Sequence, residues 1–322
     1  MDNETARFRW AYIGCGSIAN TTAAAIRRSH AVVSVYARNY EKACAFAKRH
    51  RAKAYRTFEE AVTAPDVDAV YIATPHTSHT EYAVRAMELG KPVLCEKPVG
   101  VSEAQARRLV EAARTHGVYC CEAMWTWFSD VAMQVRGWIR DGRVGDVTRV
   151  EMHYAFPGIL ASRDSRLLSP QTAGGALLDI GVYPITYCYR LFGAPAKITC
   201  EGELRGGIDA RETVTLSYDG FDCTLHISLT EARESCVIEG SAGRITVPLF
   251  HMASFALLTS GGKRTFFRGR TDYRTEFDRV SLEIRAGKTE SDYVPFDATV
   301  SCLAIMDECR RQMGLVYPFE AS

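Results

Sequence analysis

Regular alternation of strand-like apolar runs with helix-like stretches is the feature that most constrains the fold of this chain. Over residues 7–123, runs such as FRWAYIG and AVVSVYA alternate with amphipathic stretches such as HTEYAVRAMELG and SEAQARRLVEAARTHG. Each stretch is long enough to return the chain to the same end of a sheet, as parallel pairing requires. The alternation predicts an α/β domain over residues 1–124, with a doubly wound parallel sheet.

The pattern changes over residues 125–322. One helix is expected at residues 129–141, and it is followed by runs such as RVEMHYAF, TVTLSYDG and DCTLHISL, bounded by Gly or Asp. Apolar and polar residues alternate in these runs with a period of two, which predicts a mainly antiparallel, open-faced sheet in an α+β domain. A last helix is expected at residues 297–313.

Length, charge and cysteine content exclude several classes of partner. A chain of 322 residues is longer than one hydrophobic core usually supports, which agrees with two domains. A net charge of +1 leaves no excess for binding nucleic acid or an anionic membrane, and no apolar run approaches ~18 residues. Eleven cysteines, scattered through apolar segments without zinc-ligand spacing, indicate reduced thiols. We expect a cytoplasmic protein.

A glycine-rich turn joins the first expected strand to the first expected helix. Glycines at its first and third positions allow a tight turn and a close approach of the backbone to a pyrophosphate, and alanine at the sixth is a permitted variant. The position of the turn within a βαβ unit predicts a dinucleotide site. The turn reads GCGSIA and consists of Gly14, Cys15, Gly16, Ser17, Ile18 and Ala19.

The end of the second expected strand discriminates between NAD and NADP. A carboxylate there would accept the ribose hydroxyls of NAD, but this chain has Arg38, with Lys42 one helical turn later. A guanidinium binds a 2′-phosphate through two hydrogen bonds, whereas a carboxylate would repel it. We therefore expect NADP. The alternative is that both cations belong to a solvated helix start.

Two further strands, AVYIATP and PVLCEKP, end at the edge of the sheet where doubly wound folds bind ligands. Their polar ends are expected beside the nicotinamide. A metal is not expected at the HTSH sequence, because zinc would need a third ligand, and hydrogen bonding is the expected role. The expected cofactor contacts at this edge are Thr74, Pro75, His76, His79, Glu96 and Lys97.

Together these motifs resemble those of the glucose-fructose oxidoreductase / inositol dehydrogenase (Gfo/Idh/MocA) family. GCGSIA, ATPHTSH, EKP and GGALLDIGVYP occur in the order and spacing of that family. EAMWTWF, LLDIGVYPI and the ending YPFE are similar to its dihydrodiol dehydrogenase and NADP-linked xylose dehydrogenase branch. The resemblance implies a Rossmann domain, a small-molecule substrate held between two domains, a last helix packed on the first domain and a cis Lys97–Pro98 bond.

The resemblance also implies roles for individual residues. Lys97 takes part in catalysis, Glu96 lies close to the nicotinamide, and Tyr183 stands where many members have histidine, with Asp179 one helical turn earlier. Carbonyl reduction needs a proton donor, and a nearby ammonium lowers the pKa of a tyrosine. We expect Tyr183 to be the general acid/base, Lys97 its electrostatic partner and Asp179 an orienting group. Whether Lys97 or Tyr183 transfers the proton stays open, as does a purely structural role for Asp179 and Tyr183.

Aromatic and basic residues are candidates for substrate contact. Trp125 and Phe128 are expected near the cleft, and Trp127 stands where the related WTRF sequence has arginine. Arg163 and Arg166 lie in the loop SRDSRLLSPQ and either reach the substrate or are exposed. Aromatic faces suit a sugar ring as well as an aromatic dihydrodiol, so a sugar, a cyclic polyol and a trans-dihydrodiol all stay open as substrates.

Apolar residues on two strands of the second domain predict self-association. Val214 and Leu216 alternate in TVTLSY, as do Leu225, Ile227 and Leu229 in TLHISL. Too few helices are expected in this half to cover such a face, so we expect a homodimer through the sheet.

An alternative function is that of a regulatory protein that senses NADP without catalysis. Such a protein would be expected to have lost its proton donor. This chain keeps both Lys97 and Tyr183, which favours an oxidoreductase.

Overall fold

The computed structural model of this protein describes residues 7–160 and 165–320, which form two compact units. The change of pattern after Met124 coincides with a boundary between them. Two segments differ from the predicted domains 1–124 and 125–322, since residues 101–103 group with unit 2 and residues 273–296 with unit 1. Unit 1 comprises Met1–Gly100, Ala104–Met124 and Tyr273–Phe296, and unit 2 comprises Val101–Glu103, Trp125–Asp272 and Asp297–Ser322.

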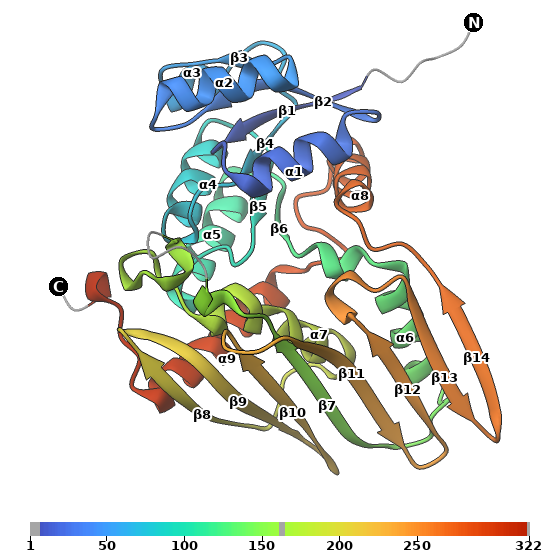
Figure 1. The fold of residues 1–322 in the computed structure, drawn as a ribbon. Helices are drawn as coiled ribbons and strands as arrows, with labels where there is room; N and C mark the ends of the chain where they lie inside the picture. The colour runs from blue at the N-terminus through green and yellow to red at the C-terminus, as the bar shows by residue number, and fades with distance from the viewer. Residues whose placement is uncertain (1–6, 161–164, 321–322) are drawn as a thin grey trace, which may run out of the picture. The chain divides into compact units, whose positions relative to one another are not determined.

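A six-stranded parallel sheet forms the centre of unit 1, in the order β3-β2-β1-β4-β5-β6 (Figure 1). The winding direction reverses between β1 and β4, which confirms the predicted doubly wound sheet. The strands are β1 (Phe8–Ile13), β2 (His30–Tyr36), β3 (Lys53–Ala54), β4 (Ala69–Ile72), β5 (Val93–Glu96) and β6 (Cys120–Ala123). The helices are α1 (Ser17–Ile26), α2 (Tyr40–His50), α3 (Phe58–Val62), α4 (His79–Glu88), α5 (Glu103–His116) and α8 (Tyr273–Arg285).

Helix α8 belongs to unit 1 although it is far along the chain from the other helices and strands of that unit. Its Phe277 is fully buried, with ring centroids 4.9 Å from Trp10 and 5.1 Å from Tyr71. His30 in β2 is also paired with Asp278 in α8, with 2.7 Å between Nε2 and Oδ1. Contacts with α1 complete the packing of α8. This buried aromatic cluster is the physical reason why residues 273–296 group with unit 1.

Unit 2 is built on an eight-stranded sheet in the order β14-β13-β12-β11-β7-β10-β9-β8. Strands β7 and β10 pair in parallel, and the other described neighbours pair antiparallel, which confirms the predicted mainly antiparallel sheet. The strands are β7 (Val147–Ala155), β8 (Lys197–Arg205), β9 (Ile208–Tyr218), β10 (Phe221–Ser228), β11 (Arg233–Gly240), β12 (Gly243–Pro248), β13 (Phe255–Ser260) and β14 (Lys263–Arg268). The helices are α6 (Asp130–Arg140), α7 (Val182–Phe192) and α9 (Phe296–Met313).

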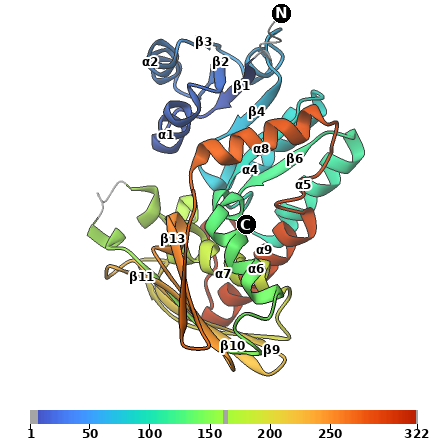
Figure 2. The ribbon, with the colours of Figure 1, turned by 90° about the vertical axis from the view of Figure 1, so that its right-hand side faces the viewer.

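Helices of the same unit cover one face of this sheet. Figures 1 and 2 show α7 and α9 along that face, and the π-helical turn Leu177–Gly181 contacts β7, β9 and β10. The expectation that too few helices remain to cover the apolar residues is therefore wrong. The packing of α9 on unit 1 stays a prediction. The five apolar residues in question are all buried, namely Val214, Leu216, Leu225, Ile227 and Leu229.

Two further features concern the cysteines and the length of the helices. All eleven cysteines are free thiols, and most of them are buried, as expected for small apolar side chains in a reducing environment. Across residues 7–160 and 165–320, no helix combines the length and the apolar character needed to cross a membrane.

Substitution of Phe277 tests whether α8 is part of the core of unit 1. Phe277→Ala should lower the free energy of unfolding by about 3 to 5 kcal/mol, because it leaves a cavity among Trp10 and Tyr71. Leu282→Ala on the same helix is the control, since Leu282 is 65% exposed and its loss should cost within about 0.5 kcal/mol. Urea unfolding of both variants gives the comparison, and similar small losses would contradict the assignment of α8 to this core.

Candidate active site

The glycine-rich turn after β1 is shaped for an anion. Gly14 has a φ of +102°, and a Cβ there would lie 2.4 Å from the carbonyl oxygen of Ala73, so only glycine is accommodated. Gly16 precedes α1, and apart from its chain neighbours no described atom lies within 4 Å of the position where its Cβ would be. No described side chain caps the first turn of this ten-residue helix. Its N–H groups therefore remain available to a pyrophosphate, so the turn fits a dinucleotide.

The other residues of this turn complete the fit. Ala19 is fully buried, whereas Ser17 is exposed and Cys15 and Ile18 are half-buried. Burial raises the pKa of the Cys15 thiol, and the ammonium of Lys42 opposes this shift. Lys42 thus lies close enough to the turn for its charge to act there.

The two cations predicted to bind a 2′-phosphate follow β2. Arg38 and Lys42 are both exposed at the start of α2. Between them, Asn39 caps the helix, since its side-chain oxygen accepts a hydrogen bond from the backbone N–H of Lys42 at 2.8 Å. The positive charge of Arg38 acts on Tyr82 in α4, where it opposes the rise in pKa that burial causes. The cap and the helix fix the spacing of the two charges.

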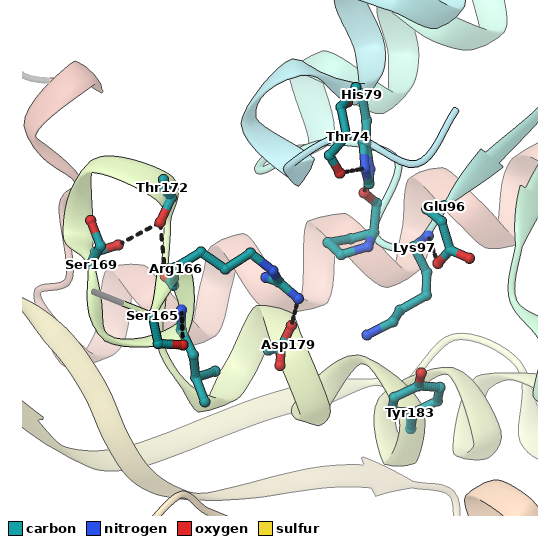
Figure 3. Close-up of polar contacts among 12 residues, drawn as sticks. Thr74, His79, Glu96, Lys97, Ser165, Arg166, Ser169, Thr172, Asp179 and Tyr183 are labelled. Atoms are coloured by element: carbon teal, nitrogen blue, oxygen red, sulfur yellow. Dashed lines mark hydrogen bonds and ion pairs between the residues drawn. The ribbon is translucent and has the colours of Figure 1, made fainter. Parts of the chain in front are cut away.

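His79 links the ends of β4 and β5. Its Nε2 lies 2.7 Å from the carbonyl oxygen of Thr74, and its Nδ1 lies 2.8 Å from that of Pro98 (Figure 3). Both ring nitrogens therefore contact backbone carbonyls, which agrees with a hydrogen-bonding role. Pro75 precedes the short 3₁₀ turn that contains His76, and His76 is buried.

Buried carboxylates hold the turn after β5. The Lys97–Pro98 bond is cis, as the family resemblance implied. Glu96 is 7% exposed, and it accepts hydrogen bonds from the hydroxyl of Tyr71 and, at 3.3 Å, from the N–H of Lys97. Glu122 in β6 accepts a hydrogen bond from the N–H of Val99 at 3.2 Å. Glu96 is thus a structural anchor of the turn that carries Lys97.

A third buried acid lies near these two. Glu276 in α8 is fully buried, and neither of its carboxyl oxygens has a hydrogen-bond partner in the described part of the chain. Burial raises the pKa of Glu276 well above its usual range, and the charges of Glu96 and Glu122 raise it further. This shift favours the uncharged form of Glu276, which limits its electrostatic repulsion with Glu96 and Glu122.

In unit 2, Tyr183 lies in the first turn of α7, directly after the π-helical turn Leu177–Gly181. Such turns are frequent at functional sites. The Tyr183 side chain is largely buried, and its hydroxyl oxygen accepts a hydrogen bond from the indole Nε1 of Trp125 at 3.2 Å. The structure therefore brings together two of the residues singled out from the sequence.

Asp179 belongs to the same π-helical turn. Its Oδ1 accepts a hydrogen bond from Nη2 of Arg166 at 2.7 Å (Figure 3). Arg166, a candidate substrate residue, and Asp179, the expected orienting group, thus form one ion pair in which the arginine side chain is half exposed. Arg163 lies outside the described residues. Among the aromatic candidates, Phe128 is fully buried, and buried Trp127 packs its ring against the guanidinium of Arg190.

Sequence reasoning missed His251. Its ring stacks on Tyr154 with 4.6 Å between centroids, and it lies 5.6 Å from the ring of Tyr183 and 5.9 Å from that of Trp125. The carboxylate of Glu234 holds it, with 2.8 Å from Oε1 to both the backbone N and Nδ1 of His251. No motif marks this histidine, because a single residue between two strands has no informative spacing.

Comparison with known proteins covers both units. The family model "Oxidoreductase family, NAD-binding Rossmann fold" (GFO_IDH_MocA) matches residues 8–123, and the "GFO/IDH/MocA C-terminal domain" model matches residues 132–246. Trans-1,2-dihydrobenzene-1,2-diol dehydrogenase of Danio rerio is 31% identical over 96% of this chain and 98% of its own length. The NADP(+)-dependent scyllo-inositol 2-dehydrogenase of Bacillus subtilis is 32% identical over 89% of this chain and 90% of its own length.

Solved structures share the fold. A 3-ketoreductase from Actinomadura kijaniata in complex with NADP and TDP-benzene has a TM-score of 0.86 at 22% identity, covering 95% of this chain and 98% of that one. An aldose-aldose oxidoreductase from Caulobacter crescentus complexed with glycerol has a TM-score of 0.87 at 20% identity, covering 95% and 97% of the two chains.

The raised pKa of Glu276 predicts a pH-dependent stability. Above its ordinary value of 4.5, the unfolded chain releases this proton while the folded chain keeps it, so rising pH favours unfolding. Glu276→Gln removes this effect. The stability of the variant relative to the native chain should rise by up to about 1.4 kcal/mol per pH unit within this window.

Urea unfolding over a series of pH values from about 5 to 8 measures this trend. The matched control is Glu111→Gln in α5, which changes an exposed glutamate. A stability difference between Glu276→Gln and the native chain that does not change with pH would show that Glu276 is ionised in the folded protein.

Proposed function

We propose a function from one premise: this chain belongs to the GFO/IDH/MocA family of oxidoreductases, as its sequence motifs predicted. We propose that it is an NADP-dependent enzyme that transfers a hydride to or from a secondary alcohol or carbonyl carbon of a sugar, cyclic polyol or trans-dihydrodiol. The observation that carries this proposal is the buried hydroxyl of Tyr183, which accepts a hydrogen bond from Trp125. The other unit of the same chain has a glycine-rich turn whose N–H groups are available to a phosphate.

The proposed cofactor site is assembled from the edge of the parallel sheet. Backbone N–H groups of the glycine-rich turn bind the pyrophosphate, and Arg38 and Lys42 bind the 2′-phosphate, which NAD lacks. The nicotinamide, when bound, supplies or accepts the hydride. The other proposed contacts are Thr74, Pro75, His76, His79, Glu96 and Lys97. The NADP(+)-dependent relative at 32% identity supports this choice of cofactor.

The proposed proton chemistry uses Tyr183, Lys97 and Asp179. As a carbonyl is reduced, negative charge develops on its oxygen, and the Tyr183 hydroxyl donates the proton that neutralises it. Negative charge then develops on the phenol oxygen, where the indole N–H of Trp125 stabilises it. We propose that the positive charge of the Lys97 ammonium also stabilises the negative charge on the phenol oxygen. Asp179, paired with Arg166, orients the substrate hydroxyls.

The relatives narrow the proposed substrate class. One is named for a trans-dihydrodiol and another for an inositol, and both of these molecules are rings with adjacent hydroxyl groups. We therefore propose a cyclic compound with vicinal hydroxyls. The ring of Trp125 provides an apolar surface for it, and the Arg166–Asp179 pair offers both donors and acceptors to its hydroxyls.

We also propose a homodimer in the cytoplasm. Free thiols support this compartment. A dimer would use the face of the eight-stranded sheet opposite α7 and α9, where Thr215, Thr224 and Val237 are half-buried. Ultracentrifugation at micromolar concentration should give a dimer, and a monomer would contradict the proposed assembly.

Arg38→Ala tests the choice of cofactor. It should weaken NADPH binding by about 1.5 to 3 kcal/mol, the usual contribution of a charge-assisted hydrogen bond, and leave NADH binding nearly unchanged. Lys48→Ala, at the far end of the same helix, is the control and should affect neither cofactor. Fluorescence titration measures all the dissociation constants. Equal losses for NADPH and NADH would refute the assignment of Arg38 to the 2′-phosphate.

Lys97→Met and Tyr183→Phe test the proton chemistry. Each should lower turnover on the order of 10²- to 10⁴-fold with little change in NADPH affinity. Because the two residues act as a unit, the double variant should be hardly worse than either single one. Tyr189→Phe, on the same helix as Tyr183, should keep normal turnover. If the losses of turnover in the two single variants multiply in the double variant, Lys97 and Tyr183 act in separate steps. Near-normal turnover of Lys97→Met would mean that the turn carrying Lys97 is purely structural.

A further inference from the structure

Two histidines and a glutamate gather on the sheet of unit 2. Glu151 and His153 are two residues apart on β7, so their side chains point to the same face of the sheet. His226 on β10 stands directly opposite His153 in the parallel pairing of these strands. None of the three belongs to the proposed cofactor or substrate residues. Potential ligand atoms of all three lie within 4.8 Å of one another.

The spacing of these atoms is close to that of metal ligands. Nε2 of His153 lies 2.9 Å from Oε1 of Glu151, and the rings of His153 and His226 stack with centroids 4.4 Å apart. Two ligand atoms bound to one zinc ion in tetrahedral geometry are about 3.3 Å apart, given bonds of about 2.0 Å. At 2.9 Å the Glu151–His153 contact is a hydrogen bond, closer than two zinc ligands, so zinc would replace the proton between these atoms and move them slightly apart. The His226 ring would tilt to supply the third ligand.

Neighbouring groups support this geometry. Oγ1 of Thr213 lies 3.4 Å from Nδ1 of His226, which is the position of the outer partner that usually orients a metal-binding imidazole. Arg149 forms an ion pair with the other carboxylate oxygen of Glu151, Oε2. This contact orients the carboxylate and leaves Oε1 directed at His153.

The local charge selects the class of ion. Arg149, Arg233 and Arg244 line the same pocket as Glu151 and Glu239, so the local charge opposes any divalent cation and the affinity must come from the imidazole ligands. Mg²⁺ and Ca²⁺ need several oxygen ligands, whereas this cluster offers one carboxylate and two imidazoles. Imidazole nitrogen suits zinc, nickel and copper. The donor set therefore favours Zn²⁺ over the alkaline-earth ions.

We propose that Glu151, His153 and His226 form a binding site for one Zn²⁺ ion per chain. Each residue supplies one ligand atom, and the fourth position of the tetrahedron is open to water. The site is separate from the proposed oxidoreductase chemistry, in which a metal has no role.

Equilibrium dialysis of the chelator-treated full chain against ZnCl₂ tests the proposal. The native protein should bind one ion per chain. Loss of an outer partner weakens metal affinity roughly 10- to 100-fold, and His226→Ala, which removes a ligand, should weaken the affinity for Zn²⁺ by more than that. His116→Ala, which removes an exposed histidine of α5, is the matched control and should bind as the native chain does. Val237, which lies on the sheet face proposed for the dimer, lines the same pocket, so the number of ions per chain is measured together with the oligomeric state.

Free cysteines are the main competing ligands, so a second measurement uses Co²⁺. Absorption spectra of the native protein should lack the near-ultraviolet charge-transfer band that thiolate ligands produce. Thermal unfolding of metal-free His226→Ala should match that of the metal-free native chain, which shows that the variant is folded. Failure of the native chain to bind Zn²⁺, equal binding by His226→Ala, or a thiolate spectrum would overturn the proposal and leave the cluster a polar ladder on the sheet.

Discussion

The hydrogen bonds of buried carboxylates are the constraint on which the Lys97 turn of unit 1 depends. A charge taken out of water must be compensated, and Glu96 and Glu122 are compensated by Tyr71 and by backbone N–H groups around the turn after β5. Satisfying these acids fixes the backbone that carries Lys97. Glu276 can join them only in its uncharged form, because a third negative charge would remain without a partner.

Unit 2 positions its proposed proton donor by a different means. Aromatic packing confines the ring of Tyr183, with His251 and Tyr154 on its sides and the indole N–H of Trp125 on its oxygen. The contact of Glu234 with the backbone N and Nδ1 of His251 in turn fixes the orientation of this packing. A hydroxyl held in this way loses little conformational freedom when it meets a substrate, which is the advantage of a preorganised site.

Local patterns in the sequence predicted the parts of the fold that local physics determines. The glycine turn, the strand ends at Thr74 and Glu96 and the two kinds of sheet follow from periodicity and turn chemistry, and the family resemblance supplied Tyr183 and Asp179. The location of α8 could not be predicted in this way, because an amphipathic helix does not reveal which sheet it covers. Burial of Glu276 and the contact of His251 with Tyr183 likewise depend on tertiary packing between distant segments.

The central claim is that this protein catalyses NADP-dependent hydride transfer and does not merely bind the cofactor. The most direct test measures the absorbance of NADPH incubated with the native chain and a panel of sugars, cyclic ketones and diketones. A second assay measures the formation of NADPH from NADP⁺ with a matching panel of polyols and trans-dihydrodiols. We predict that at least one cyclic vicinal-hydroxyl compound or its ketone changes the absorbance, and that it does so faster with NADP(H) than with NAD(H). Tight NADPH binding without turnover of any member of either panel would contradict the claim and identify a cofactor-sensing protein instead.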